Sequence, residues 1–313
     1  MEIYNPTSPV NGIEPDLTFE AYCLANAMNN TRLKIAAKSL WRLKQVLDHP
    51  ERDNFDNETL LQGRQFHSLL LEPDHFYHRY AILDDTTKEK ILEQEKERVE
   101  TENETRTKSS RLTMPKDFRR GTPSYKAWKK EQAEAGREEV DAEWFVGMHE
   151  MCESIRSYQE VWDLIDGSQT EVTAFGTFEK SGDWSLQLKA RFDMLKHDTD
   201  YIIDLKTTRS IVEDDFNRQI QNLGYHKAAA FYTDVARMAG LDKRRFGFLV
   251  VEKEWPFDCT VHWLPDEWLQ LGRREYQADL YKLAHAYETG EWDRIPVSEI
   301  IPPAWLDSIL NTL

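Results

Sequence analysis

Alternating apolar and polar side chains run through residues 185–195. Leu186, Leu188, Ala190 and Phe192 occupy the even positions, whereas the odd positions are polar. Because successive side chains of a strand point to opposite faces, this alternation predicts a β-strand. Comparable patterns predict four more strands, at residues 171–179, 200–206, 245–251 and 259–264. A polar turn containing a glycine, at residues 180–183, joins the first two strands.

Helical spacing of apolar residues predicts six helices. In one of them Leu33, Ala36, Leu40, Leu43 and Leu47 recur every three or four residues, which indicates a stripe that faces a core. The six segments are residues 17–29, 30–49, 59–71, 138–158, 214–240 and 265–289. Strands followed by helices in this order predict an α/β fold with a mixed central sheet flanked by helices.

The apolar pattern is interrupted between residues 84 and 140. Residues 88–108 are rich in Glu, Lys and Arg, and we expect an exposed helix or a partly disordered loop there. Residues 111–130 are locally basic and contain Phe118, Tyr125 and Trp128. Two interpretations stay open: a surface that binds phosphates and stacks bases, or a solvated insertion anchored by its aromatic residues.

We therefore predict one domain over residues 1–313. Its parts are an N-terminal arm and helix (1–29), a charged insertion (84–140), the sheet (171–264) and a C-terminal helix and tail (265–313).

Composition narrows the possible classes of protein. The chain contains no apolar run long enough to span a membrane and begins without the features of a secretory signal. Its three cysteines are scattered singly, which indicates a reducing cytoplasm and excludes a four-cysteine cluster within the chain. The formal net charge of −16 opposes tight DNA binding, although a local basic stripe or bound cations would offset it.

Three charged residues carry the candidate chemistry. Asp204 and Lys206 are two positions apart in a predicted strand, so they share a face, and a hairpin brings Asp193 alongside them. Burying two carboxylates and a lysine together is costly unless a divalent cation lies between the acids. The pattern predicts a Mg²⁺ or Mn²⁺ site. If only these three residues are considered, the alternative interpretation is a salt bridge on the surface at a strand end.

Asp193 followed by Asp204-Leu205-Lys206 resembles the motif of the PD-(D/E)XK nuclease superfamily. A second run, from Gly63 through His67 to Leu69-Leu70-Leu71-Glu72-Pro73 and Phe76, resembles a segment of the RecE-type exonucleases (exodeoxyribonuclease VIII and its prophage relatives). The resemblance covers residues 30–305. It continues in order through Glu171 to Phe175, Arg191-Phe192-Asp193, Asp204 to Thr208, Tyr225-His226, Ala230-Phe231-Tyr232 and Phe246 to Val251.

The resemblance implies a set of ligands for two metal ions, either Mg²⁺ or Mn²⁺. Asp193, Asp204 and the Leu205 carbonyl would bind metal, Glu171 would join the same cluster, and His67 would contact a second ion. Lys206 would orient or deprotonate the attacking water, and the two ions would stabilise an in-line displacement.

Gln221 and Tyr225 form a further candidate pair. On a single helix they would lie one turn apart on one face, which resembles the Q-x-x-x-Y motif of RecB-like nucleases. They would hold the scissile phosphate or the terminal base. The sequence departs from the RecE-type pattern directly after Tyr225-His226. RecE-type sequences usually have a glutamine there, whereas this chain has Lys227-Ala228. This difference would alter substrate handling if that glutamine contacts DNA.

The implied function is a phage- or prophage-type exonuclease in the cytoplasm of a bacterial host. It would degrade the 5′ strand of linear double-stranded DNA from its ends and leave 3′ overhangs for a single-strand annealing protein. A homo-oligomeric ring around the DNA, acidic outside and basic inside, would accommodate the net charge. Two alternatives stay open: a structure-specific endonuclease of the same superfamily, and a non-catalytic protein that binds DNA or a partner.

Overall fold

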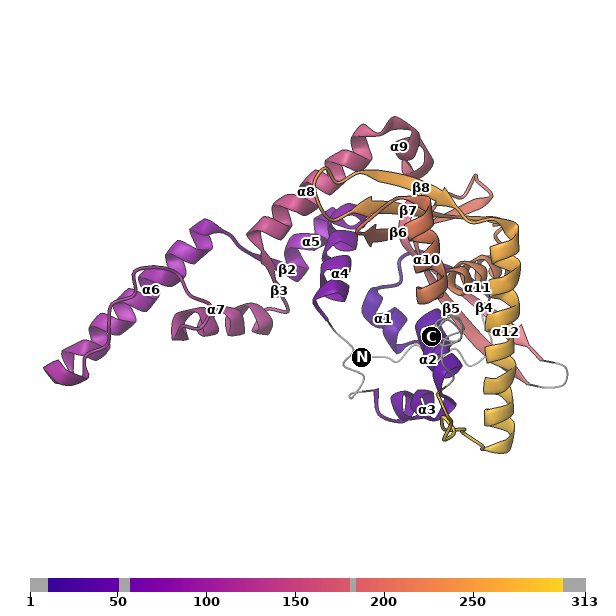
Figure 1. Ribbon diagram of the computed structural model, residues 1–313, viewed down its shortest axis with the longest axis horizontal. Coiled ribbons are helices and arrows are strands. Elements are labelled where there is room, and N and C mark those ends of the chain that lie inside the picture. Colours follow the sequence, from indigo (N-terminus) through magenta and orange to yellow (C-terminus); the bar gives the residue numbers. More distant parts are fainter. Residues whose placement is uncertain (1–10, 51–56, 181–183, 301–313) are drawn as a thin grey trace, which may run out of the picture.

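The computed structural model describes residues 11–50, 57–180 and 184–300. Most of the predicted turn at 180–183, the first ten residues and the tail beyond residue 300, which includes Trp305, lie outside the described residues. The structure is α/β, and a long arm leaves its body (Figure 1).

A six-stranded mixed sheet forms the centre of the body. Neighbouring strands are antiparallel except β6 and β7, which run parallel because two helices connect them. In sheet order the strands are β1 (Gly12–Glu14), β4 (Gln169–Glu179), β5 (Ser185–Leu195), β6 (Tyr201–Thr208), β7 (Arg245–Glu252) and β8 (Cys259–Trp263). The five predicted strands are confirmed. Strand β1 was not predicted, because three residues are too few to show a period.

Helices cover both faces of the sheet. On one face pack α2 (Asn30–Lys38), α3 (Leu40–Asp48), α10 (Glu213–Leu223), α11 (Tyr225–Met238) and α12 (Asp266–Thr289). On the other pack α4 (Glu58–Leu71), α5 (Pro73–Arg79), α8 (Ala142–Ser157) and α9 (Gln159–Ile165). Strand β7 serves both layers: Phe246 and Phe248 face the first group, and Leu249 and Val251 face the second. Its near-continuous apolar run reflects burial on both faces.

Two predicted helices are each divided in two. The segment 30–49 breaks at Ser39, which is extended and whose hydroxyl caps α3 by accepting from the Arg42 N–H. The segment 214–240 breaks at Gly224, which adopts the left-handed conformation (φ 64°, ψ 40°) that ends a helix. Both breaks are local backbone events that apolar spacing does not reveal.

The N-terminal segment extends the sheet and covers the polar side of β5. Helix α1 (Phe19–Leu24) is shorter than predicted, and the chain after it lies beside β5, where the Met28 N–H donates to Gln187 O. Lys189 is therefore buried, and its ammonium donates to the carbonyls of Tyr22 and Ala25 at 2.6 and 2.9 Å. The odd positions of β5 are covered rather than solvated.

The charged insertion forms the arm. It consists of α6 (Asp85–Glu104), a short 3₁₀ turn (Lys108–Ser110) and α7 (Pro123–Glu134). Strands β2 (Tyr80–Leu83) and β3 (Glu138–Asp141) pair in parallel at its base, so the predicted helix at 138–158 begins as a strand. Leu83, Ile91 and Tyr125 form a small core inside the arm. Of the two possibilities for residues 88–108, the helix is the one observed.

Helices α11 and α12 cross closely at Gly272. A Cβ atom added there would overlap with the His226 carbonyl oxygen and carbon. Gly272→Ala should lower the free energy of unfolding by about 1–3 kcal/mol, because backbone atoms cannot move aside cheaply. Denaturant unfolding measures this change. Gly121→Ala is the control, since a Cβ at Gly121 meets nothing within 4 Å. Equal midpoints for the two variants would contradict the close crossing.

Candidate active site

The site lies where β5 and β6 separate. Their pairing ends at Met194 with Ile203, and the next residues, Asp193 and Asp204, no longer pair through their backbones. The Asp193 side chain enters this fork and accepts a hydrogen bond from the Leu205 N–H at 2.7 Å. The fork therefore holds a carboxylate that belongs to one strand and is oriented by the other.

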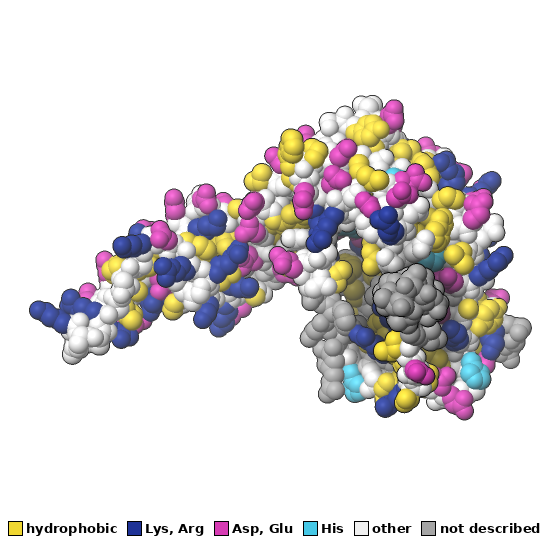
Figure 2. Space-filling view, in the orientation of Figure 1, with side chains coloured by type: hydrophobic (Ala, Val, Ile, Leu, Met, Phe, Trp, Pro, Cys, Tyr) yellow, Lys and Arg dark blue, Asp and Glu magenta, His cyan; other side chains and the backbone are white. Residues whose placement is uncertain are grey.

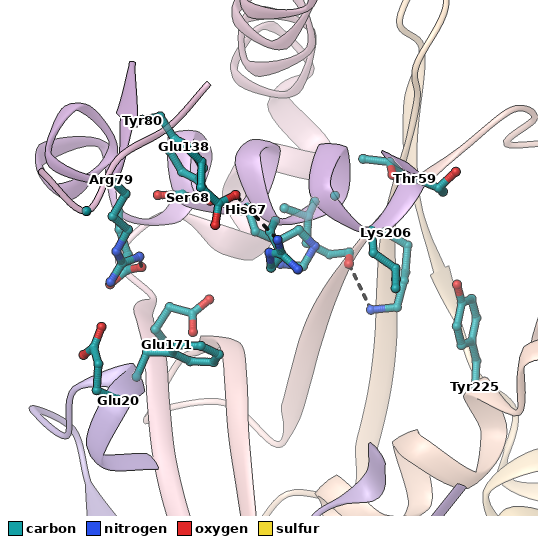
Figure 3. A pocket seen from close by; sticks show the side chains of 18 residues that line it. Glu20, Thr59, His67, Ser68, Arg79, Tyr80, Glu138, Glu171, Lys206 and Tyr225 are labelled. Atoms are coloured by element: carbon teal, nitrogen blue, oxygen red, sulfur yellow. Dashed lines mark hydrogen bonds and ion pairs between the residues drawn. The ribbon is translucent and has the colours of Figure 1, made fainter. Parts of the chain in front are cut away.

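Asp204 and Lys206 share a face of β6, as predicted, and form an ion pair. Asp204 is only 6% exposed, so this pair is largely shielded from water. The Lys206 ammonium also donates to the Leu205 carbonyl at 3.0 Å and lies 5.5 Å from the centre of the Tyr225 ring. These three contacts fix the position of the lysine, and Figure 3 shows Tyr225 beside it.

His67, Glu171 and Asp193 form the one group of three or more potential metal ligands in the described part of the chain, and one ligand atom from each lies within 4.8 Å of the others. Helix α4 places His67 Nδ1 at 3.6 Å from Asp193 Oδ2. Glu171 stands opposite Asp193, because the pairs on either side of it join the same strands β4 and β5. Three segments distant in sequence thus meet at one point.

Glu171 has a strained backbone, with φ of 55° in the middle of a strand. Such a conformation in a residue other than glycine costs on the order of 1–3 kcal/mol and occurs most often at functional sites. Arg191 holds the carboxylate: its Nε donates to Glu171 Oε2 at 2.6 Å, and its Nη1 donates to the Leu17 carbonyl at 2.7 Å. The strained backbone and the ion pair with Arg191 together hold the Glu171 carboxylate beside His67 and Asp193.

Burial sets the charge of each group in the cluster. It raises the pKa of Asp193 to about 7, with the neighbouring Asp204 carboxylate adding to the effect. Burial, followed by the Asp193 carboxylate, raises the pKa of Glu171. Burial lowers the pKa of His67 to about 4, so the imidazole is neutral and able to donate a lone pair to a metal at neutral pH.

Lys206 behaves differently from its neighbours. Burial by itself would lower the pKa of Lys206, but the carboxylates of Asp204 and Asp193 outweigh it and raise the pKa. The protein alone therefore holds Lys206 as a protonated ammonium. This favours the predicted orienting role over the predicted role as a base.

The residues present fit a divalent cation. Two carboxylates and a neutral imidazole are ligands that such ions accept. Both carboxylates are only partly exposed, at 20% for the Glu171 side chain and 15% for that of Asp193, and a bound cation would offset the desolvation that raises their pKa values. Asp204 turns to Lys206 and is not one of the three converging ligands, and the Leu205 carbonyl accepts from Lys206. The prediction that these two groups also bind metal stays a prediction.

A cavity of about 560 Å³ opens in front of the cluster (Figure 3). His67, Glu171, Leu205, Lys206 and Tyr225 all line it. Its other walls come from α1, from α4 and from the base of the arm, through residues that include Phe19, Glu20, Thr59, Arg64, Arg79, Tyr80, Gly136 and Glu138. Five of the predicted site residues thus share one cavity with α1 and the base of the arm, whereas Asp193 and Asp204 lie behind its lining.

Gln221 is not part of this arrangement. It is exposed near the end of α10 and does not line the cavity, and the break at Gly224 separates it from Tyr225. The prediction that both residues share one helix face is wrong, because a left-handed residue between them ends the first helix. The role of Gln221 itself stays a prediction.

Two basic residues near the site were not identified as site residues from sequence. Lys34 lies on the helix predicted at residues 30–49, and its ammonium lies 5.7 Å from the centre of the Tyr225 ring. Arg191 was noted as part of a motif without a role. The contact of Lys34 shows only in the fold, because α2 is distant in sequence from Tyr225, whereas Arg191 and Glu171 lie on the neighbouring strands β5 and β4.

Arg191 provides a test of how Glu171 is positioned. Arg191→Met should reduce metal affinity or activity by about 10–100-fold, the usual cost of removing the partner of a ligand. Arg191→Lys should recover part of this loss, because it restores the charge without the fixed geometry of the guanidinium group. Titration of Mn²⁺ by calorimetry measures the affinity. Unchanged affinity in Arg191→Met would show that Glu171 does not depend on this ion pair.

The fold and the site define the class of this protein. A mixed sheet flanked by helices, with an acid at the fork of two strands and an Asp-x-Lys on the second strand, is the arrangement of a PD-(D/E)XK-type nuclease fold. Residues 31–296 match the model of the family described as "PDDEXK-like domain of unknown function (DUF3799)". The chain belongs to this family.

Comparison with solved structures agrees with this fold. A protein from Eubacterium rectale, described as a "putative exonuclease", superposes with a TM-score of 0.53 at 16% sequence identity, over 90% of this chain and 92% of that one. A second structure, SSO0001, has a TM-score of 0.28 at 13% identity over 63% of this chain and 86% of its own, a similarity too low to indicate a shared fold. No curated protein matches this sequence. No described helix is long and apolar enough to cross a membrane.

Proposed function

We propose that this protein is a metal-dependent exonuclease that acts on the ends of linear double-stranded DNA. The observation that carries the proposal is the convergence of His67, Glu171 and Asp193 next to the Asp204–Lys206 ion pair, at a cavity that His67, Glu171 and Lys206 line. Carboxylates that can hold a cation beside a protonated lysine suit the hydrolysis of a phosphodiester, whose transition state is rich in negative charge.

The chain's own residues have separate tasks in this reaction. His67, Glu171 and Asp193 would hold the cation, which when bound would activate a water and neutralise charge on the phosphate. Lys206, kept protonated and fixed by Asp204, orients the attacking water and stabilises the charge that develops on the phosphorus. Tyr225 borders the lysine and supplies a surface for the terminal nucleotide.

An exonuclease is favoured over an endonuclease by the shape of the site. The cavity has walls from α1, α4 and the base of the arm, and its size is typical of pockets that hold small ligands. A strand end enters such a pocket more readily than a continuous duplex does. The Eubacterium rectale protein, which is described as a "putative exonuclease", supports the same choice.

The resemblance to RecE-type enzymes supports three further parts of the proposal. We propose 5′-to-3′ polarity, 3′ overhangs passed to a single-strand annealing protein, and a ring-shaped homo-oligomer in the cytoplasm of a bacterial host. A monomer by light scattering at the concentrations that give full activity would contradict the ring.

Digestion of a linear duplex labelled at one 5′ end tests the activity. The reactions contain Mg²⁺ or Mn²⁺ and run beside a covalently closed circle. Progressive release of the 5′ label from the linear DNA alone is the expected result. Cutting of the circle would identify an endonuclease. The absence of cleavage with both metals would favour a non-catalytic binding protein.

A further inference from the structure

One segment of the arm is strongly basic, although the arm as a whole, residues 84–140, contains 14 basic and 14 acidic residues and is neutral. Residues 105–130 contain nine Lys and Arg residues and one acidic residue, a net charge of +8, whereas the whole chain carries −16. The chain outside this segment therefore carries −24, and the part outside the arm carries −16. A body of that charge repels DNA, and phosphate binding needs a local region of opposite sign.

The basic side chains of this segment are available to a ligand. We define the basic arm surface as Lys108, Arg111, Lys116, Arg119 and Lys126, all of which are exposed. Within the described part of the chain, no side-chain hydrogen bond or ion pair occupies any of them. Two lysines of α6 differ, because Lys88 pairs with Asp85 and Lys96 with Glu93 on the same helix. Figure 2 shows Lys and Arg side chains along the arm and at its free end.

The aromatic residues of the segment face inward. Tyr125 is 6% exposed and contacts the rings of Phe118 and Trp128, with centroids 5.8 and 6.0 Å away. This packing agrees with the aromatic anchors of the second interpretation, whereas phosphate binding by the basic residues stays a prediction. Rings packed on one another cannot stack nucleobases, so this surface lacks the platform that proteins use to bind single strands. What remains is a row of charges suited to a sugar–phosphate backbone.

The arm also begins at the candidate active site. Arg79 and Tyr80, directly before α6, and Gly136 and Glu138, directly after α7, line the cavity. Helix α6 has 20 residues, so at a rise of about 1.5 Å per residue it reaches about 30 Å from that point. At about 3.4 Å per base pair, this length corresponds to roughly nine base pairs.

We propose that the basic arm surface binds the phosphates of the intact duplex beyond the nucleotide being cleaved, without reading its sequence. This inference rests on the proposed function for its substrate and assigns the arm a separate task. The arm holds the duplex while the cavity receives the strand end, which explains how a strongly acidic protein retains DNA. Binding should be strong at low salt and fall steeply as salt rises, because each phosphate contact releases counterions.

A charge-matched pair of variants tests the proposal. One carries Lys116→Gln, Arg119→Gln and Lys126→Gln on the basic arm surface. The control carries Lys88→Gln, Lys90→Gln and Lys96→Gln on α6, which removes the same charge from the same arm. Both are made in the Lys206→Ala background, and binding of a labelled 30-base-pair duplex is measured by anisotropy in EDTA between 50 and 200 mM KCl. Thermal unfolding verifies that each variant folds.

The surface variant should bind the duplex at least tenfold more weakly than the background, and the slope of log K against log salt should become shallower by about 2–3. The control should change affinity less than threefold. Equal losses in both variants, or no loss in the surface variant, would overturn the proposal. Tighter binding of a single-stranded 30-mer than of the duplex would overturn the choice of ligand.

Cleavage assays separate this inference from the proposed function. With Lys206 present, the surface variant should hydrolyse bis(p-nitrophenyl) phosphate, a diester too small to reach the arm, at the wild-type rate, and should digest a 60-base-pair duplex with a raised KM. Wild-type protein that binds duplex through the arm but cleaves no DNA would contradict the proposed function only. Cleavage with identical KM values in both proteins would contradict the arm's role only.

Discussion

Replacing Lys206 by alanine is expected to lower the rate of DNA cleavage by about 10²–10³-fold, the usual cost of removing one group that stabilises transition-state charge. The carboxylates of Asp204 and Asp193 keep this lysine protonated, and its contacts with Asp204, Leu205 O and Tyr225 hold it in place. Single-turnover digestion of a linear duplex at saturating Mg²⁺ measures the change, because it isolates the chemical step from product release.

A second lysine provides the matched control. Lys227 forms a comparable ion pair with Asp279, at 2.9 Å, but does not line the cavity. Lys227→Ala should therefore retain cleavage within about threefold of wild type. If both variants lose activity equally, disrupted packing rather than chemistry explains the loss. If Lys206→Ala keeps its activity, this site is not where DNA is cleaved.

Replacing Asp193 by asparagine is expected to have two opposite effects. Metal-free protein should become more stable, by an increase of several degrees in Tm at pH 8, because the variant no longer buries a carboxylate whose pKa is raised to about 7. Protein with 10 mM Mn²⁺ should lose most of the stabilisation that the metal provides, since binding to the folded state alone raises stability. Cleavage should fall by at least about 10²-fold.

The pH dependence of this effect has a defined sign. A carboxyl whose pKa is raised on folding binds more protons in the native state, so the stability of the metal-free wild type falls as pH rises from about 4 to about 7. Asp193→Asn should remove part of that decline. Glu20→Gln is the control, because Glu20 lines the cavity outside the cluster. A variant of Asp193 that keeps the full Mn²⁺-induced increase in Tm would exclude this residue as a ligand.

Much of the fold follows from local pattern. Strand β5 has the predicted bounds. The ion pair between Asp204 and Lys206 follows from the alternation of side chains along a single strand, because residues two positions apart share a face. The predicted helix at 265–289 also matches α12 closely. The divided helices show the limit of such patterns, because Ser39 and Gly224 change the backbone without interrupting the apolar spacing.

The sequence by itself determined the class of fold, five of the six strands of the central sheet and the Asp193, Asp204 and Lys206 set, because neighbouring strands and alternating faces bring these residues together through short-range geometry. Only the tertiary structure decided how the site is completed. His67 joins Asp193 across 126 positions of chain, Glu171 takes up a strained backbone, and Lys34 approaches Tyr225. These contacts depend on how the helices pack over the sheet. Packing involves the whole core, so the spacing of apolar residues within one helix or strand does not predict it.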